Sequence, residues 1–142
     1  SCVIFAESSS LRLIRYCLHG ASQGQTEIFA PLPSMPDNIS VGSDGFLWVA
    51  MPSASADSFL GLQKLPRVLR WLLIQLSHLL KPPPITGGVI AFDFDGRQKY
   101  SFALDSPLYR QPTGVREHQG KVYLGSIVAD SLAVFSVQTK IQ

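Results

Sequence analysis

The chain has 142 residues, of which 46% are hydrophobic and 15% are charged, and its formal net charge is +2. This composition fits one small folded domain and excludes a disordered tail. The Lys and Arg residues are too sparse for a nucleic-acid-binding surface. The first residues, SCVIFAES, lack the basic start and long apolar run of a signal peptide, and the apolar stretch 68–80 is too short and polar to span a bilayer. We therefore expect no signal peptide and no transmembrane segment in this chain, and its compartment stays open.

The first two apolar runs predict a β-hairpin. Residues 2–8 and 11–18 are rich in β-branched and aromatic residues and flank a turn of three serines. Such a hairpin would place Cys2 opposite Cys17, the only cysteines of the chain, so a cross-strand disulfide is one interpretation. The other, which we favour from sequence, is a pair of buried thiols that pack as small hydrophobic groups.

Further along the chain, the same pattern of strand, tight turn and strand returns. After a short run at 26–32, Asp44-Gly45 and Asp95-Gly96 each separate two apolar runs, and Gln119-Gly120 does so more weakly. Dipeptides that end in glycine favour tight hairpin turns because these turns need a positive φ. A last strand is expected over 132–138.

One segment, 66–80, departs from the β pattern and predicts an amphipathic helix. Pro66 suits a first helical turn, and three prolines from Pro82 end the segment. We expect the helix to lie on the sheets and bury most of its apolar face. A contact with a partner subunit or a membrane surface is the alternative, because Trp71 and Ile74 add apolar surface outside that face. The apolar face comprises Leu65, Val68, Leu69, Leu72, Leu76, Leu79 and Leu80.

The repeated hairpins predict a mainly β fold, and specifically part of a β-propeller. Repetition of such units is typical of propellers, whose four-stranded blades pack face to face. The chain accounts for about three blades, the first of them incomplete, with the helix inserted in one blade. We expect residues 1–142 to form a single domain. A ring needs at least four blades, so this chain alone does not close one.

Three segments carry a resemblance to a known family: 3–20 (VIFAESSSLRLIRYCLHG), 32–51 (LPSMPDNISVGSDGFLWVAM) and 113–126 (TGVREHQGKVYLGS). They resemble strictosidine synthase-like proteins, within the wider group of gluconolactonases, senescence-marker-type lactonases and paraoxonases. The second segment, with its Pro-Asp-Asn start and Asp-Gly turn, is the most specific. The resemblance implies the C-terminal half of a six-bladed propeller.

The resemblance also implies a metal site in the central channel. The lactonase relatives hold a divalent cation there, usually calcium, on acidic and amide side chains from several blades, and hard cations prefer such oxygen ligands. Asp37 stands where those relatives place an acidic ligand, and Asn38 stands beside it. The alternative, left open, is that both residues cap the turn before a strand. One or two ligands do not complete a calcium site, so we expect the chain alone to bind metal weakly or not at all.

Two further residues are candidates for the channel wall. Glu7 ends the first strand, where the family often has Glu, but we favour a solvated carboxylate that faces Arg12 or Arg15. Thr113 stands where the amine–aldehyde condensing enzymes that name the family have their catalytic Glu. Threonine does not act as a general base near neutral pH, which argues against that chemistry. Glu117 and His118 are interpreted as solvated turn residues.

Two functional interpretations follow. In the first, the chain is part of a metal-dependent hydrolase of small lactones or esters and is inactive as an isolated monomer. In the second, it is a non-enzymatic binding or assembly module. Exposed blade faces and edges tend to associate, so we expect a homo-oligomer, most simply a dimer that completes or covers the open propeller.

Overall fold

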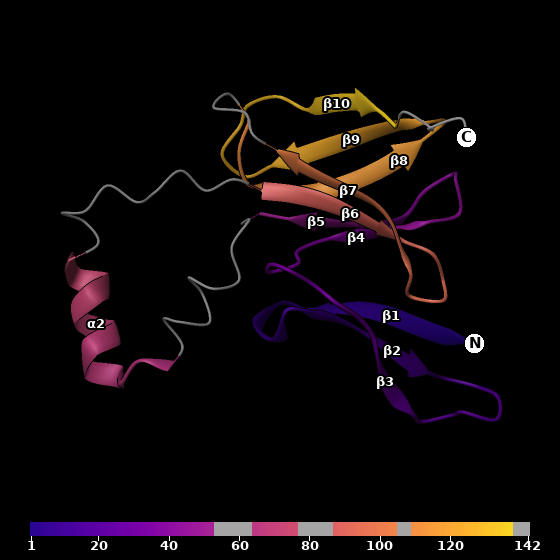
Figure 1. The fold of residues 1–142 in the computed structure, drawn as a ribbon, viewed down its shortest axis with the longest axis horizontal. Coiled ribbons are helices and arrows are strands. Elements are labelled where there is room, and N and C mark those ends of the chain that lie inside the picture. Colours follow the sequence, from indigo (N-terminus) through magenta and orange to yellow (C-terminus); the bar gives the residue numbers. More distant parts are fainter. Residues whose placement is uncertain (53–63, 77–86, 105–108, 138–142) are drawn as a thin grey trace.

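The computed structural model describes residues 1–52, 64–76, 87–104 and 109–137. These residues form three antiparallel sheets in chain order and one helix (Figure 1). The mainly β fold and the partial propeller are thus confirmed. In this part of the chain the blades hold three, four and three strands.

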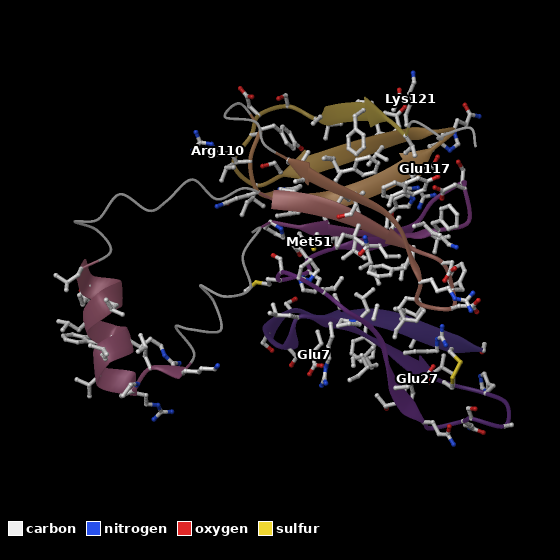
Figure 2. The ribbon with its side chains drawn as sticks, in the orientation of Figure 1. Glu7, Glu27, Met51, Arg110, Glu117 and Lys121 are labelled. Carbon is white, nitrogen blue, oxygen red and sulfur yellow. A yellow bond between two sulfur atoms is a disulfide. The ribbon has the colours of Figure 1, made fainter. Side chains whose placement is uncertain are left out.

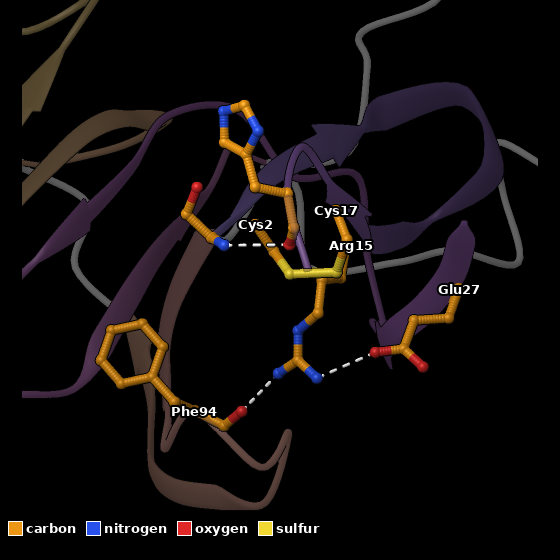
Figure 3. Close-up of a disulfide and its surroundings, with 7 residues drawn as sticks. Cys2, Arg15, Cys17, Glu27 and Phe94 are labelled. Atoms are coloured by element: carbon orange, nitrogen blue, oxygen red, sulfur yellow. Dashed lines mark hydrogen bonds and ion pairs between the residues drawn. A yellow bond between two sulfur atoms is a disulfide. The ribbon is translucent and has the colours of Figure 1, made fainter. Parts of the chain in front are cut away.

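The first blade contains β1 (Cys2–Glu7), β2 (Arg12–Cys17) and β3 (Thr26–Pro31) in that order. A 3-10 turn over Ser8–Ser10 joins β1 to β2, so the predicted hairpin is confirmed. Cys2 is the direct partner of Cys17 in the ladder, and their sulfur atoms form a disulfide (Figure 3). The favoured expectation of two thiols is therefore wrong, because pairing of β1 with β2 brings the cysteines face to face.

The second blade has four strands: β4 (Ile39–Val41), β5 (Leu47–Met51), β6 (Gly87–Phe92) and β7 (Gln98–Leu104). The Asp44-Gly45 turn joins β4 to β5, and Gly45 has the positive φ of 79° that the turn requires. Every residue of β5 and β6 is buried. Because alternate side chains of a strand point to opposite faces, this blade must be covered on both sides.

The third blade contains β8 (Pro112–His118), β9 (Lys121–Ser126) and β10 (Ala133–Ser136), with β9 in the middle. The Gln119-Gly120 turn joins β8 to β9, and both residues have positive φ. The strand expected over 132–138 corresponds to β10, and its last expected residue lies outside the described residues.

Two hydrophobic clusters hold the blades together. The first lies between the first and second blades, where Leu13 and Phe29 meet Val49 and Ile90. The second lies between the second and third blades, where Trp48 and Val89 meet Val122 and Leu124. The Trp48 ring stacks on Tyr100 and Phe102, with ring centroids 5.7 and 6.3 Å apart. The middle blade is the shared layer of both clusters.

Helix α2 (Arg67–Leu76) falls within the segment predicted to be helical, while residues 77–80 lie outside the described part. It stands apart from the sheets (Figure 1), and Val68 and Trp71 are 79% and 61% exposed. The expectation that it buries its apolar face on the sheets is wrong for the described residues. None of the helices described is long and apolar enough to span a membrane.

Candidate channel site

The short strand β4 and the longer strand β8 lie side by side where the second and third blades meet. Three polar side chains of the β4 segment donate hydrogen bonds to successive positions along β8. The Asn38 amide donates to the carbonyl oxygen of Thr113 at 2.7 Å, and the Ser40 hydroxyl donates to that of Val115 at 2.6 Å. Ser43, just beyond β4, donates to Glu117 at 3.0 Å. The two innermost strands therefore run in parallel and are joined along their length.

Asp37 and Asn38 lie at the start of β4, beside Thr113 near the start of β8. The Asn38 backbone N–H also donates to Thr113, and the Asp37 backbone N–H donates to the carbonyl of Ala50 in β5. Asn38 thus links two blades. The Asp37 side chain is exposed, and its carboxylate has no hydrogen bond or ion pair in the described part of the chain. Within the ranges that the structure describes, Asp37 is therefore an anionic group at this end that remains available to a ligand.

Glu7 lies at the end of β1, at the same end of the blades as Met51 and Arg110 (Figure 2). Its carboxylate forms an ion pair with Arg12, with 2.5 Å between Oε2 and Nε, across the first hairpin. The hydrogen bond from Arg12 holds the pKa of Glu7 below its ordinary value. The ion pair expected from sequence is confirmed, and a role of Glu7 in a channel stays a prediction.

The residues of this end do not by themselves fit a calcium ion. Calcium takes six to eight oxygen ligands, usually with several carboxylates. Asp37 offers one free carboxylate, Glu7 is paired with Arg12, and Asn38 and Thr113 offer only neutral oxygens. Among the described residues, no group of three or more His, Cys, Asp or Glu side chains is placed to hold a metal. Any full site would need ligands from elsewhere.

The opposite end of β4 and β8 holds a buried carboxylate that sequence reasoning missed. Glu117 is only 1% exposed and accepts hydrogen bonds from Ser43 Oγ and from the backbone N–H groups of Asp44 and Gly120. Gly42 makes room for it, because a Cβ there would lie 2.6 Å from Glu117 Oε2. The expectation of a solvated Glu117 is wrong, while His118 is exposed as expected.

The electrostatics of Glu117 follow from these contacts. Burial alone raises the pKa of this carboxyl, but the hydrogen bonds from Gly120, Asp44 and Ser43 outweigh burial and lower the pKa below 4.5. Glu117 therefore stays ionised near neutral pH and joins the β4–β5 turn to the β8–β9 turn. A sequence signal for the burial of Glu117 does exist. Residues two apart in a strand share a face, so Glu117 lies on the same face as the apolar Val115, and both are buried.

No protein-family model matches the chain. It is 30% identical over 94% of its length to the Arabidopsis thaliana protein strictosidine synthase-like 3 and 29% identical over 96% to strictosidine synthase-like 10. It is 32% identical over 87% to the adipocyte plasma membrane-associated protein of Danio rerio.

The chain spans about a third of the length of these curated relatives. Their matches cover all three blades, including the segments with Asp37 and Thr113. The repeated hairpins, the propeller-like packing of the blades and the similarity to these relatives all indicate the same family. The chain belongs to the strictosidine synthase-like family.

Proposed function

We propose that the chain supplies part of the channel wall of a propeller that hydrolyses small lactones or esters. The carboxylate of Asp37 would be one ligand of a divalent cation, calcium by the resemblance, and the other ligands would come from outside the described residues. The observation that carries this proposal is the free, exposed Asp37 carboxylate at the start of an innermost strand. A bound cation in such a site polarises a carbonyl or activates water.

Thr113 favours hydrolysis over amine–aldehyde condensation. It stands where the condensing relatives have a catalytic Glu, and its carbonyl accepts two hydrogen bonds from Asn38. A threonine hydroxyl does not accept a proton near neutral pH, so the base needed for condensation is missing at this position. Asn38 accordingly acts in positioning Thr113 and β8 against β4.

The test compares the variant Asp37→Asn with the control variant Asp95→Asn. Asp95 is an exposed aspartate in a hairpin turn, and its carboxylate pairs with Arg97. The test uses the homo-oligomer of the chain, because the isolated monomer is expected to be inactive. We expect this homo-oligomer to bind calcium with a Kd on the order of millimolar. We expect it to hydrolyse phenyl acetate or a γ-lactone only with calcium present. Asp37→Asn should lose both properties, and Asp95→Asn should keep both. The readouts are calorimetric calcium titration and hydrolysis with and without EDTA. Unchanged calcium binding in Asp37→Asn would exclude the proposed ligand.

A second candidate function is a non-enzymatic assembly module. It is favoured by apolar side chains on the outward faces of the first and third blades. On the first blade Phe5 and Ile28 are 46% and 57% exposed, and on the third blade Val134 is 52% exposed. Exposed apolar faces on sheets usually mark contacts with another protein. This function predicts association of the chain without any hydrolysis.

A further inference from the structure

Helix α2 belongs to an insertion that the second blade does not need. The insertion, residues 52–86, joins β5 to β6, which are direct neighbours in the sheet with Met51 opposite Gly88. Two antiparallel strands in this register are normally joined by about two to five residues. Much longer connections in a compact domain usually serve a function. Neither hydrophobic cluster includes a described residue of α2, so the packing of the blades does not account for the helix.

The described residues of α2 carry one apolar stripe. Val68, Leu72 and Leu76 are spaced four residues apart, so they lie above one another along the helix. Leu69 lies beside them and completes the stripe. All four side chains are exposed, and the three described blades leave them uncovered (Figure 1). The apolar stripe therefore offers contact to a surface outside the described residues.

The opposite side of the helix is positively charged. Arg67 and Arg70 are three residues apart, on the side away from the apolar stripe. The Arg70 guanidinium donates to the Leu65 carbonyl at 3.2 Å, which holds this charge at the first turn of the helix. Lys64 precedes the helix, and the sequence has no Asp or Glu anywhere in 58–92. The charge around the apolar stripe is therefore of one sign and complements an anionic surface.

Trp71 lies at the boundary between the charged side and the apolar stripe. It follows Arg67 by four residues and Val68 by three, so it is a neighbour of both on the helix surface. Tryptophan is enriched where a membrane meets water, because its ring is apolar and its indole N–H is polar. A protein groove that binds an amphipathic helix instead takes its anchor side chains from the apolar face itself. The position of Trp71 thus favours a lipid surface over an acidic protein.

We propose that α2 binds in the surface of an anionic lipid bilayer, with the apolar stripe towards the acyl chains and Arg67 and Arg70 at the level of the headgroups. The helix lies in the plane of the surface, since no described helix is long and apolar enough to cross a bilayer. Apolar area and attraction to anionic lipids together determine the affinity of such helices. This binding depends on residues 64–76 and not on hydrolysis or on Asp37.

The probe is a vesicle of phosphatidylcholine with about a third phosphatidylserine, and the signal is the tryptophan fluorescence of the intact chain. The chain has two tryptophans, and Trp48 is fully buried between the second and third blades, so a change reports Trp71. We expect the emission to shift to shorter wavelength with saturation, and brominated acyl chains to quench it. Vesicles of phosphatidylcholine alone should bind at least about tenfold more weakly, because each cation near an anionic surface strengthens binding several-fold.

Two pairs of matched variants test the two sides of the helix. Leu72→Gln removes apolar area from the stripe and should weaken binding about tenfold. Leu132→Gln makes the same change at an exposed site just before β10 and should not weaken it. Arg67→Gln should weaken binding about fivefold, and Lys121→Gln at an exposed site of β9 should leave it unchanged. Glutamine is a good helix former, so α2 should persist in both of its variants.

Absence of a shift with anionic vesicles would overturn this proposal. So would a Trp71 emission that is already that of a buried indole in the free chain, since another protein surface would then cover the helix. Polyglutamate serves as a further probe, because it is anionic but has no hydrocarbon. An equal shift with polyglutamate, without quenching by brominated lipid, would assign the charged side to an acidic protein and would also overturn the proposal.

Discussion

At the residue scale, Glu117 is the side chain on which the junction of the second and third blades most depends. It accepts hydrogen bonds from both hairpin turns at one end of β4 and β8. Ser43 also accepts a hydrogen bond from the Gln119 backbone N–H at 2.8 Å, which closes the network between the two turns. A buried carboxylate with this many donors is stabilising only as long as it is ionised.

We expect Glu117→Gln to lower the free energy of unfolding at pH 7 by about 2 kcal/mol, because an amide nitrogen would face N–H donors. Since the pKa of Glu117 is lowered in the folded state, its stabilisation is complete above the unfolded pKa and is lost as pH falls through the folded pKa. The parent chain should therefore lose more stability on acidification below about pH 4.5 than the variant does. Urea unfolding at several pH values measures both effects.

The control for Glu117 is Glu27→Gln, whose carboxylate is 60% exposed and pairs with Arg15. An exposed pair contributes little, so this change should cost less than about 1 kcal/mol. Equal losses in the two variants, or an unchanged acid response in Glu117→Gln, would contradict the role of Glu117. The role is not evident from sequence, because charged residues beside a hairpin turn are usually solvated. The alternation Val115, Glu117 would have placed the carboxylate on the inward face.

At the scale of single elements, the hairpins were the most predictable part. A glycine with positive φ after Asp44 or Asp95 is a local requirement that needs no knowledge of the rest of the fold. Asp44 adds a second local device, since its carboxylate accepts hydrogen bonds from the Phe46 N–H and the Trp48 indole. Helix α2 was equally predictable as an element. The exposure of its apolar face could not be predicted, because burial depends on a partner surface that the helix sequence does not describe.

The disulfide is the element-scale feature with the clearest energetic consequence. Cys2 and Cys17 are 15 residues apart, and closing a loop of this length removes about 3 kcal/mol of chain entropy from the unfolded state. The double variant Cys2→Ser, Cys17→Ser should lose about that much stability in urea unfolding. Parent chain kept in a thiol reductant is the control and should match the variant. Free thiols in the non-reduced parent, by thiol titration, would contradict the pairing.

At the scale of the whole molecule, the blades form a stack with a covered middle and two open faces. The outward face of the first blade carries Val3, Phe5 and Ile28, and that of the third blade carries Tyr123 and Val134. The inward faces of both blades pack on the middle blade. The sequence predicted how many blades the chain builds, because hairpins are local. The sequence could not predict what covers the outer faces of the first and third blades. The covering surface belongs to another part of the protein or to another molecule.

We expect these outer faces to make the chain a dimer in solution, in which the first blade of one copy packs on the third blade of the other. Two such junctions related by a two-fold axis satisfy both open faces, whereas a single copy leaves both exposed. Light scattering after gel filtration at micromolar concentration should give twice the monomer mass of 15.5 kDa.

Ile28→Asp or Val134→Asp should each convert the dimer to monomer, because a single charge disrupts both symmetric junctions. The control is Val68→Asp on α2, where the side chain is equally apolar and more exposed but lies away from the two faces. It should leave the dimer intact. A parent chain that stays monomeric would exclude this assembly. A dimer that Val68→Asp dissociates while Ile28→Asp does not would instead assign the contact to the helix, and the outer blade faces would then need another partner.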